Sequence, residues 1–392
     1  MKILISHYGI FKKGGWGRTF SLAKGLVDLG NDVTLLTTWP KKSLLIKRQN
    51  IDGVKVIIFP DIIPNMFTSK GFGLTSLLLK IIYVTFNKFE IVHSDEGHRP
   101  LSGVPCRLNK KIYNSIYVAE WWDLFGKGGE YDNKSFLFKL FLGRYELKYE
   151  IKDKKYADGI VVLSEYLKQK AQKINNKKNI IKIHGGADID KIEYIFDNRL
   201  IKIKYGISKD CLTFGIIEAL DPVWTEMKPF VECLTALKNQ MNFKLLVYGG
   251  KITDTVKKNL KIEDMLHEFG WTDYSFESEK LACTDIFVMI KSDNLIYNAG
   301  WPNSLGDAMA CGRPILINPV GETNDFVKKY PHGFFITKAD KYSIKNSIIR
   351  ILSERENLFN LGRINREIAE NEISWKNKSE ALYSFYKKIK TL

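Results

Sequence analysis

Short apolar runs alternate with amphipathic stretches along the whole chain. These runs are rich in Ile and Val and are continuous, which is typical of parallel strands buried on both faces. In the first half we expect strands over residues 2–8, 31–37, 54–59, 89–94, 115–120, 159–164 and 180–183. The pattern restarts after residue 190, with strands expected over residues 212–218, 243–249, 285–290, 314–318 and 333–337.

Two successive series of strands and helices predict two doubly wound α/β domains. A single large barrel is the alternative, and the irregular stretch 183–199 between the series argues against it. The length of 392 residues also favours two cores over one. Because open parallel sheets bind ligands beyond the carboxyl ends of their strands, the loops that follow the strands are the candidate sites.

The positive charge is concentrated in the first half of the chain. Residues 1–186 hold 31 Lys and Arg against 16 Asp and Glu, whereas residues 187–392 hold 29 against 28. The first half is therefore expected to face an anionic partner, namely a membrane, a phosphorylated acceptor or nucleic acid. Basic residues spread over several helices without a known nucleic-acid module make nucleic acid the weakest of the three.

Cysteine, histidine and hydropathy patterns narrow the class of protein further. Five scattered cysteines indicate free thiols in a reducing compartment, and six scattered histidines predict no metal site. The apolar segment 73–86 contains Lys80 and is too short to span a bilayer. We expect a cytoplasmic protein, or one attached to the inner face of the cell membrane from one side.

Two loops in the first half could hold chemistry. Gly14, Gly15 and Gly17 could let backbone approach a ligand, or could serve only a tight turn. Arg18, in the first turn of the next helix, is either beside a bound anion or solvated. After a later strand, Glu120–Asp123 combines two carboxylates with Trp121 and Trp122, as a sugar-acceptor site would, although a core Trp and capping acids are the alternative.

Residues 133–156 mix Phe and Leu with Lys and Arg at near-helical spacing. A basic amphipathic helix can lie in a membrane interface, or it can pack its apolar face on the sheet. The charge asymmetry of the chain favours the membrane.

The second half offers loops suited to a nucleotide. Lys228 lies near the start of a predicted helix, Gly249 follows a strand, and Trp271 could stack on a base. Surface exposure of the lysine and burial of the tryptophan are the alternatives.

Residues 298–315 place a loop before a short helix. Free N–H groups of Asn303, Ser304 and Leu305 could hold a phosphate, and Asp307 could accept from two ribose hydroxyls. A capped helix with a solvated acid is the other interpretation.

The stretch GWPNSLGDAMACGRPI, residues 300–315, resembles the donor motif of retaining glycosyltransferases of family 4, which have the GT-B fold. Residues 1–18, 157–169, 183–189 and 373–386 resemble further segments in the same order, so the resemblance covers essentially the whole chain. It implies Rossmann-like domains over residues 1–188 (acceptor and membrane side) and 189–370 (donor side), with a helix over 371–392 that returns to the first domain.

The resemblance also shows departures at the motif, which is a degenerate form of Glu-x7-Glu. Asp307 matches the second Glu of the family and Ala299 matches the first, so the sugar end of the site has lost an acid. Lys228 matches the family's lysine, but the arginine that precedes it is absent. Trp122-Asp123 stands where the family has a His-Asp pair.

The resulting site prediction has three parts. Lys228, Asp123 and Glu120 are the predicted catalytic residues, and acceptor contacts are predicted for Arg18, Trp121 and Trp122. The donor contacts are predicted for Gly15, Lys228, Gly249, Trp271, Gly300, Trp301, Asn303, Ser304, Leu305 and Asp307. No metal and no cofactor are expected.

The resemblance implies transfer of a sugar, with retention, from a nucleotide-diphosphate sugar to a glycan or lipid-linked acceptor in polysaccharide or glycolipid assembly. Peripheral contact with an anionic membrane is expected, and nucleic acid is not. The alternatives are an inactive homologue that binds nucleotide-sugar as a scaffold, favoured by Ala299, and a nucleotide-sugar epimerase on the same fold.

Overall fold

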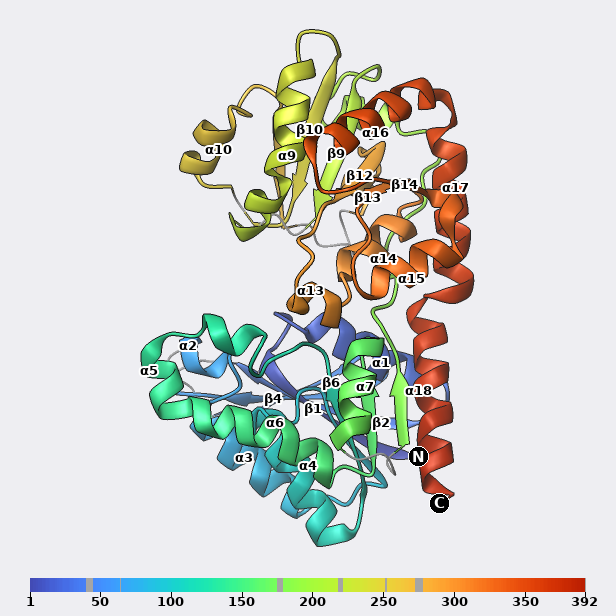
Figure 1. Ribbon diagram of the computed structural model, residues 1–392. Helices are drawn as coiled ribbons and strands as arrows, with labels where there is room; N and C mark the ends of the chain where they lie inside the picture. The colour runs from blue at the N-terminus through green and yellow to red at the C-terminus, as the bar shows by residue number, and fades with distance from the viewer. Residues whose placement is uncertain are drawn as a thin grey trace. The chain divides into compact units, whose positions relative to one another are not determined.

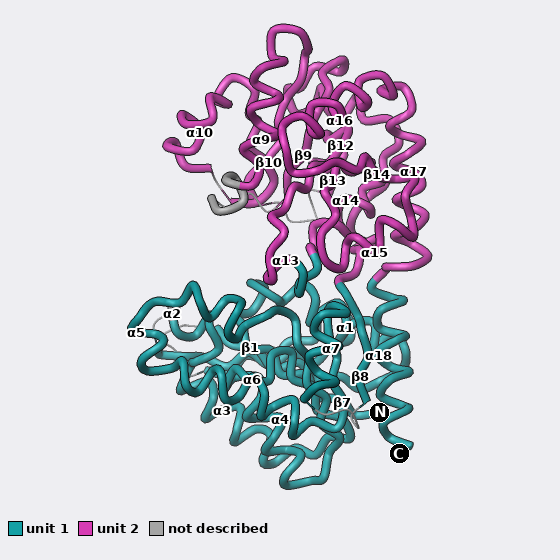
Figure 2. The backbone as a smooth tube through the Cα atoms, in the orientation of Figure 1, with its two compact units in different colours: residues 1–184, 298–301, 375–392 teal, residues 185–297, 302–374 magenta. Residues whose placement is uncertain are grey.

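The computed structural model describes residues 1–39, 45–63, 65–174, 179–217, 221–250, 252–271 and 278–391. The chain divides into two compact units, coloured in Figure 2. Unit 1 comprises residues 1–184, 298–301 and 375–392, and unit 2 comprises residues 185–297 and 302–374. The main divisions fall at 184/185 and 374/375, whereas the sequence predicts them at 188/189 and 370/371.

Unit 1 is built on an eight-stranded sheet with the order β3-β4-β2-β1-β5-β6-β7-β8. Its strands are β1 (Lys2–Ile10), β2 (Asp32–Trp39), β3 (Lys47–Ile51), β4 (Val54–Pro60), β5 (Ile91–Ser94), β6 (Ile116–Trp121), β7 (Gly159–Val162) and β8 (Asn179–Lys182). All neighbouring strands pair in parallel except β3, which pairs antiparallel with β4. The exposed, polar edge strand β3 is the one element of this sheet that the apolar pattern does not predict.

Helices cover both faces of this sheet (Figure 1). They are α1 (Trp16–Asp28), α2 (Asn65–Thr68), α3 (Leu74–Thr85), α4 (Pro100–Tyr113), α5 (Phe136–Phe138), α6 (Arg144–Tyr156), α7 (Glu165–Ile174) and α18 (Trp375–Lys390), with a 3-10 turn η1 (Glu130–Asn133) and a π-helical turn η2 (Lys139–Gly143). Ile3 and Ile5 of β1 pack with residues of α1 and α18, while Leu4 packs with Val84 and Cys106 on the other face. This alternation follows from the two-residue period of a strand.

The last helix, α18, confirms the expected return of the chain to unit 1. Its residues Leu382, Phe385 and Tyr386 join the core beside α1. Gly25 of α1 allows the two helices to approach closely, because a Cβ there would lie 2.1 Å from Ser379 Oγ.

Unit 2 is built on a six-stranded parallel sheet with the order β11-β10-β9-β12-β13-β14. Its strands are β9 (Leu212–Ile217), β10 (Phe243–Tyr248), β11 (Leu266–Gly270), β12 (Ile286–Met289), β13 (Ile315–Ile317) and β14 (Phe334–Ile336). Its helices are α8 (Arg199–Lys204), α9 (Asp221–Leu237), α10 (Asp254–Leu260), α12 (Glu279–Ala282), α14 (Asn303–Ala310), α15 (Glu322–Lys329), α16 (Lys341–Ser353) and α17 (Leu358–Glu372), with 3-10 turns η3 (Pro331–Gly333) and η4 (Arg355–Asn357). The short helix α13 (Leu295–Ala299) spans the division between the units.

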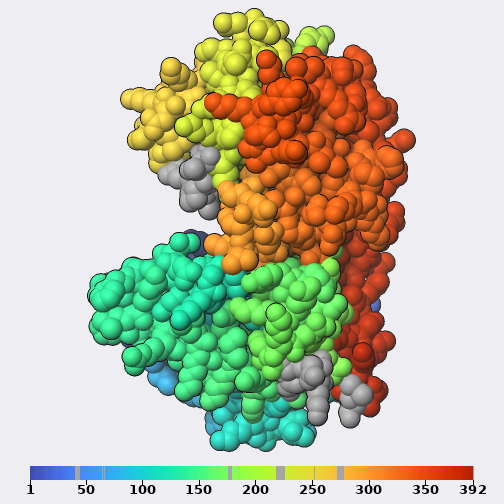
Figure 3. All heavy atoms as spheres, in the orientation of Figure 1, coloured from blue at the N-terminus to red at the C-terminus, as the bar shows by residue number. Residues whose placement is uncertain are grey.

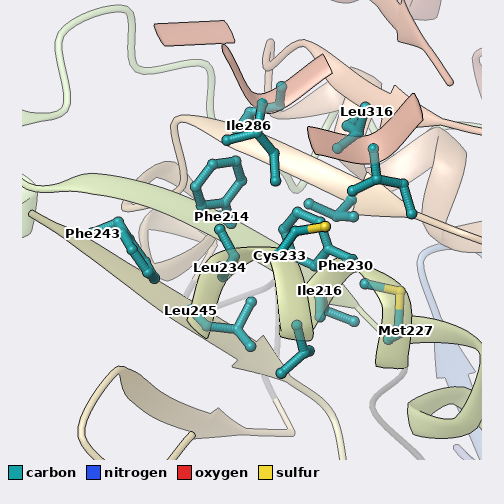
Figure 4. Close-up of a cluster of buried hydrophobic side chains, with 14 of the residues drawn as sticks. Phe214, Ile216, Met227, Phe230, Cys233, Leu234, Phe243, Leu245, Ile286 and Leu316 are labelled. Carbon is teal, nitrogen blue, oxygen red and sulfur yellow. The ribbon is translucent and has the colours of Figure 1, made fainter. Parts of the chain in front are cut away.

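The core of unit 2 lies between its sheet and the helices α9 and α16. Phe214 and Ile216 of β9 pack there with Phe230 and Leu234 of α9 (Figure 4). Two Rossmann-like units with parallel sheets and a returning C-terminal helix confirm the predicted fold class. Among the described residues, no helix combines the length and apolar character needed to cross a bilayer.

Candidate functional site

The strand order in the sheet of unit 2 reverses between the neighbouring strands β9 and β12. The connections from β9 lead outward to β10 and β11, whereas those from β12 lead outward to β13 and β14 on the other side. At such a switch point the loops after the two central strands diverge and leave a crevice beyond their carboxyl ends. This is the place where the topology favours a ligand.

A pocket with an empty volume of about 350 Å³ lies at this switch point. Ile216 and Ile217 line it from the end of β9, and residues 287–291 line it from β12 and the following loop. Met227 of α9 closes one side, while Ser304 and Ala308 of α14 contribute another wall. The pocket thus has apolar walls and a helix start beside it, which suits a flat, partly charged ligand.

The N-terminus of α14 carries no side-chain cap. Pro302 precedes the helix and makes no side-chain hydrogen bond to it, and the first turn has no acidic residue. Asn303 is exposed, and the buried Ser304 lines the pocket. Free N–H groups together with the helix dipole provide an anion site of this kind.

Close approach of backbone also shapes this helix. A Cβ at position 306 would lie 2.4 Å from the carbonyl oxygen of Gly186, so Gly306 lets the chain at residues 186–187 lie against α14. Asp307 follows on the next position and is half-buried, whereas the Leu305 side chain is fully buried. The Leu305 N–H donates to the Pro302 carbonyl at 3.1 Å, which corrects its prediction as a free donor for a phosphate. Asp307 is the acidic residue of α14, and it lies in the chain between Ser304 and Ala308, which both line the pocket.

Lys228 projects from α9 with its side chain mostly exposed. Its ammonium Nζ lies 3.9 Å from Glu232 Oε1, and that carboxylate is also bound by Lys341 Nζ at 2.6 Å. Such an exposed contact stabilises the fold little. Because the Lys228 side chain is also exposed, its ammonium is accessible to a bound anion.

Two side chains that the sequence analysis did not single out hold the loop after β12. Glu226 accepts from the Ser292 N–H at 3.1 Å and from the Tyr297 hydroxyl at 3.0 Å. Asn318 binds both backbone groups of Lys291, accepting from its N–H at 2.7 Å and donating to its carbonyl at 2.8 Å. The position of Asn318 directly after β13 could have indicated its role, whereas Glu226 lies inside α9 and has no such local signal.

The other predicted donor residues are divided between the units. Gly249, in a left-handed conformation, donates its N–H to the Gly270 carbonyl at 2.8 Å, and Trp271 is 75 % exposed directly after β11. Gly300 and Trp301 belong to unit 1, where the Trp301 ring stacks on His184 at 4.0 Å and is nearly buried. The Trp301 ring is therefore packed within unit 1, and its donor contact stays a prediction.

Arg18 and Glu120 form a buried ion pair in unit 1. The Arg18 guanidinium donates to Glu120 Oε1 at 2.5 and 2.9 Å and to the carbonyl oxygens of Ile183 and His184. Although burial opposes ionisation, the Arg18 charge lowers the pKa of Glu120 to about 2. Both side chains are interior and paired, which corrects their predictions as acceptor contact and catalytic residue.

The two tryptophans beside them are also interior. Trp121 is fully buried, with the ammonium groups of Lys154 and Lys170 over its ring. Trp122 is nearly buried because Gly15 lies on it, and a Cβ at that glycine would lie 1.9 Å from the ring. The predicted stacking of an acceptor on these rings is therefore corrected, and the half-buried Asp123 stays a prediction.

The loop after β5 carries a second set of buried charges that the sequence analysis passed over. Asp95 contacts His7 Nδ1 and accepts from Tyr8 N–H at 3.0 Å. Glu96 accepts from the Trp122 N–H at 2.8 Å and lies 3.1 Å from His98. Burial raises the pKa of Glu96 and lowers that of His98, so burial favours the uncharged form of both groups.

Gly15, the remaining predicted donor contact, lies directly before α1 and leaves room for the Trp122 ring. Among the described residues, no group of three or more His, Cys, Asp or Glu side chains is arranged to hold a metal ion. All five cysteines are buried and free.

Comparisons with known proteins give the class. Residues 211–354 match the family model described as glycosyl transferases group 1. An uncharacterized glycosyltransferase of Methanocaldococcus jannaschii is 24% identical over 338 residues, covering 83% of this chain and 80% of that protein. The matched region contains the pocket, α14 and Lys228.

Solved structures give the fold. Sucrose-phosphate synthase from Thermosynechococcus elongatus matches with a TM-score of 0.74 at 15% identity, over 99% of this chain and 98% of that one. HepE from Anabaena in complex with UDP-glucose matches with a TM-score of 0.72 at 13% identity, over the full length of both chains. The fold is that of the GT-B glycosyltransferases, and together with the matched region it supports a glycosyltransferase.

Proposed function

We propose that this protein transfers a sugar, with retention at the anomeric carbon, from a nucleotide-diphosphate sugar to a glycan or lipid-linked acceptor. The observation that carries the proposal is the pocket at the β9–β12 switch point, which borders a helix start without a side-chain cap. The base and ribose suit the apolar walls, and the diphosphate suits the N–H groups of α14.

Two charged residues of unit 2, Lys228 and Asp307, then have roles in the reaction. Negative charge develops on the leaving diphosphate, where the Lys228 ammonium and the N–H groups of Asn303 and Ser304 stabilise it. Asp307 accepts hydrogen bonds from the ribose hydroxyls and fixes the nucleotide. The acceptor oxygen attacks from the face that the diphosphate leaves, and a phosphate oxygen takes the acceptor proton.

Unit 1 is proposed to hold the acceptor and to contact an anionic membrane. Asp123, half-buried at the carboxyl end of β6, orients the acceptor hydroxyl in this proposal. The buried pair of Glu96 and His98 fixes the loop that carries it, because Glu96 binds the N–H of the neighbouring Trp122. The excess of basic residues in the first half of the chain supports the anionic partner.

The test is a panel of uridine, guanosine and adenosine diphosphate sugars, first by thermal shift and then by release of nucleoside diphosphate. We expect one donor to raise the melting temperature and to be hydrolysed slowly without acceptor. The sugar first released should keep the anomeric configuration of the donor when followed by NMR. An inverted anomer would reject retention, and an epimerised donor would indicate an epimerase instead.

A scaffold that binds nucleotide-sugar without turnover is the second candidate. Ala299, which stands where the resembled family has a glutamate, is fully buried and offers no hydrogen bond to a sugar. The same panel separates the two functions, because a scaffold shows the thermal shift but releases no nucleoside diphosphate with any donor. Failure of every donor to bind would reject both candidates.

A further inference from the structure

The segment from α5 to α6 has an inverted pattern of burial. Its apolar residues Phe136, Leu137, Leu140 and Phe141 are all more than half exposed. The inner side of α6 carries charged residues instead, namely Glu146, Glu150, Asp153 and Lys154, all nearly or fully buried. An amphipathic helix that merely covered its sheet would show the opposite arrangement.

Ionic contacts explain why the charged side of α6 faces inward. Glu146 pairs with Arg99 at 2.8 Å, and Asp153 pairs with Arg107 of α4 and accepts from the Tyr117 hydroxyl at 2.7 Å. The helix is therefore anchored through its acids. Its outward face keeps only cations among its exposed charged residues, which are Arg144, Lys148, Lys152 and Lys155.

Helix α3 shows a second inverted face. Leu74, Leu78 and Ile82 recur every four residues, so they lie on one side of the helix, and each is more than half exposed. On the opposite side Ser76 and Lys80 are fully buried. The hydrophobic effect would leave such an apolar stripe in water only at a substantial cost in free energy, which indicates a partner.

The segment before α3 contacts α5, which links the two exposed faces within unit 1. Phe72, two residues before α3, contacts the Phe138 ring of α5 with centroids 6.2 Å apart. Lys70, exposed beside it, places its ammonium 5.9 Å from the same ring. In Figure 1 the labels α2 and α5 mark adjoining helices, and Figure 3 shows the segment near residue 140 at the surface of this unit.

We propose that this apolar-cationic surface, formed by Leu74, Leu78, Phe136, Leu137, Leu140 and Phe141 with the α6 cations, docks on an anionic lipid bilayer. Exposed Phe and Leu beside Lys and Arg suit the boundary between acyl chains and anionic headgroups. A second copy of the chain suits it less, because a twofold interface would set the same cations against one another. The inference rests on the membrane contact proposed above and identifies the surface that makes it.

The first test is co-sedimentation of the whole protein with phosphatidylcholine vesicles, with and without phosphatidylglycerol. Binding should require phosphatidylglycerol and fall with salt. Phe136→Ser/Phe141→Ser should lower the partition coefficient by about tenfold or more, since two large apolar side chains lose their insertion. Leu200→Ser/Tyr342→Ser, with equally exposed apolar residues of unit 2, should bind as the wild type does.

A second pair of variants tests the cations. Arg144→Gln/Lys148→Gln should lower binding to phosphatidylglycerol vesicles by about tenfold or more, as expected for two cations near an anionic surface. Lys209→Gln/Lys345→Gln, which removes two exposed cations of unit 2, should leave it unchanged. Equal loss in both pairs would mean non-specific attraction by net charge and would overturn the proposed surface.

Insertion can be followed directly, because the five native cysteines are all buried. An environment-sensitive dye on Phe141→Cys should shift its emission to the blue with phosphatidylglycerol vesicles, whereas the dye on Leu200→Cys should not. Absence of the shift at position 141, or a wild-type dimer in ultracentrifugation that Phe136→Ser/Phe141→Ser dissociates, would overturn the proposal. Nucleotide-sugar binding, measured on the same variants by calorimetry, should stay unchanged, so failure of the donor site and of the membrane surface are separable.

Discussion

The carboxyl ends of the two sheets differ in how fully buried side chains of the protein occupy them. In unit 1 the ends of β5 and β6 are occupied by buried side chains, among them the ion pair of Arg18 with Glu120 and the contact of Glu96 with His98. In unit 2 the corresponding ends of β9 and β12 border a pocket and the uncapped start of α14. Unit 1 thus fills this end of its sheet with its own buried side chains, whereas unit 2 keeps a pocket there.

Breaking the buried pair of unit 1 should have the largest effect. Arg18→Met leaves the Glu120 carboxylate charged and without its guanidinium partner inside the protein, which should cost about 3–5 kcal/mol of unfolding free energy. Urea denaturation followed by circular dichroism measures the loss. Arg199→Met, which removes an exposed pair with Asp197, is the control and should leave the denaturation midpoint where it is. Similar midpoints for the two variants would mean that the buried pair contributes no more than a surface contact.

In unit 2 the largest effect should come from the acid of α14. Asp307→Asn should weaken nucleotide-sugar binding by about 1–3 kcal/mol, because it removes a charge-assisted hydrogen bond to the ribose. Calorimetric titration measures this, with Asp325→Asn on the exposed side of α15 as the control. A wild-type affinity for Asp307→Asn would remove this residue from the site.

A smaller effect is expected from the exposed lysine of α9. Lys228→Ala should weaken nucleotide-sugar binding about tenfold, or about 1.4 kcal/mol, and slow turnover, while the unfolding free energy stays the same. Lys238→Ala removes a lysine directly after the C-terminal end of α9 and should change neither nucleotide-sugar binding nor turnover. If both variants behave alike, the ammonium of Lys228 does not meet the diphosphate.

The last effect is a slope of stability against pH and concerns unit 1. Lys80 is fully buried, with its ammonium donating to the carbonyls of His7 and Leu101 at 2.8 and 3.0 Å. Burial lowers the pKa of Lys80 from 10.5 to about 7. Between these values the unfolded chain binds more protons than the folded one, so stability should rise with pH by up to about 1.4 kcal/mol per unit.

Lys80→Met should reduce this slope, measured by urea denaturation at several pH values from neutral to alkaline. Lys88→Met, an exposed lysine just beyond α3, serves as the control and should keep the slope. An unchanged slope in Lys80→Met would show that the buried ammonium does not titrate in this range.

Much of the fold could be predicted from the sequence because buried parallel strands are continuous apolar runs. Each of the runs named above contains a strand, from β1 to β14, within a few residues of its expected bounds. The edge strand β3 escaped because its residues Lys47–Ile51 are polar and exposed, and only its pairing with β4 defines it.

The local structure around the candidate residues could be predicted in unit 2 and much less so in unit 1. Local sequence predicts the loop before α14, because Pro302 precedes the helix and small residues follow it. Arg18 instead finds its partner Glu120 far along the chain, so local spacing suggests a free cation where the fold makes a buried pair. For residues 133–156, periodicity indicates two faces but does not say which one turns inward, and ionic contacts of Glu146 and Asp153 decide it.

Hydrogen–deuterium exchange with and without the donor chosen by the panel tests the central claim most directly. The account predicts that donor binding slows exchange in the peptide covering Asn303–Ala310, because its first N–H groups bind the diphosphate. Peptides covering residues 91–99, which are all buried in unit 1, should exchange at the same rate in both states. Slower exchange in residues 91–99 with none at α14 would contradict the account.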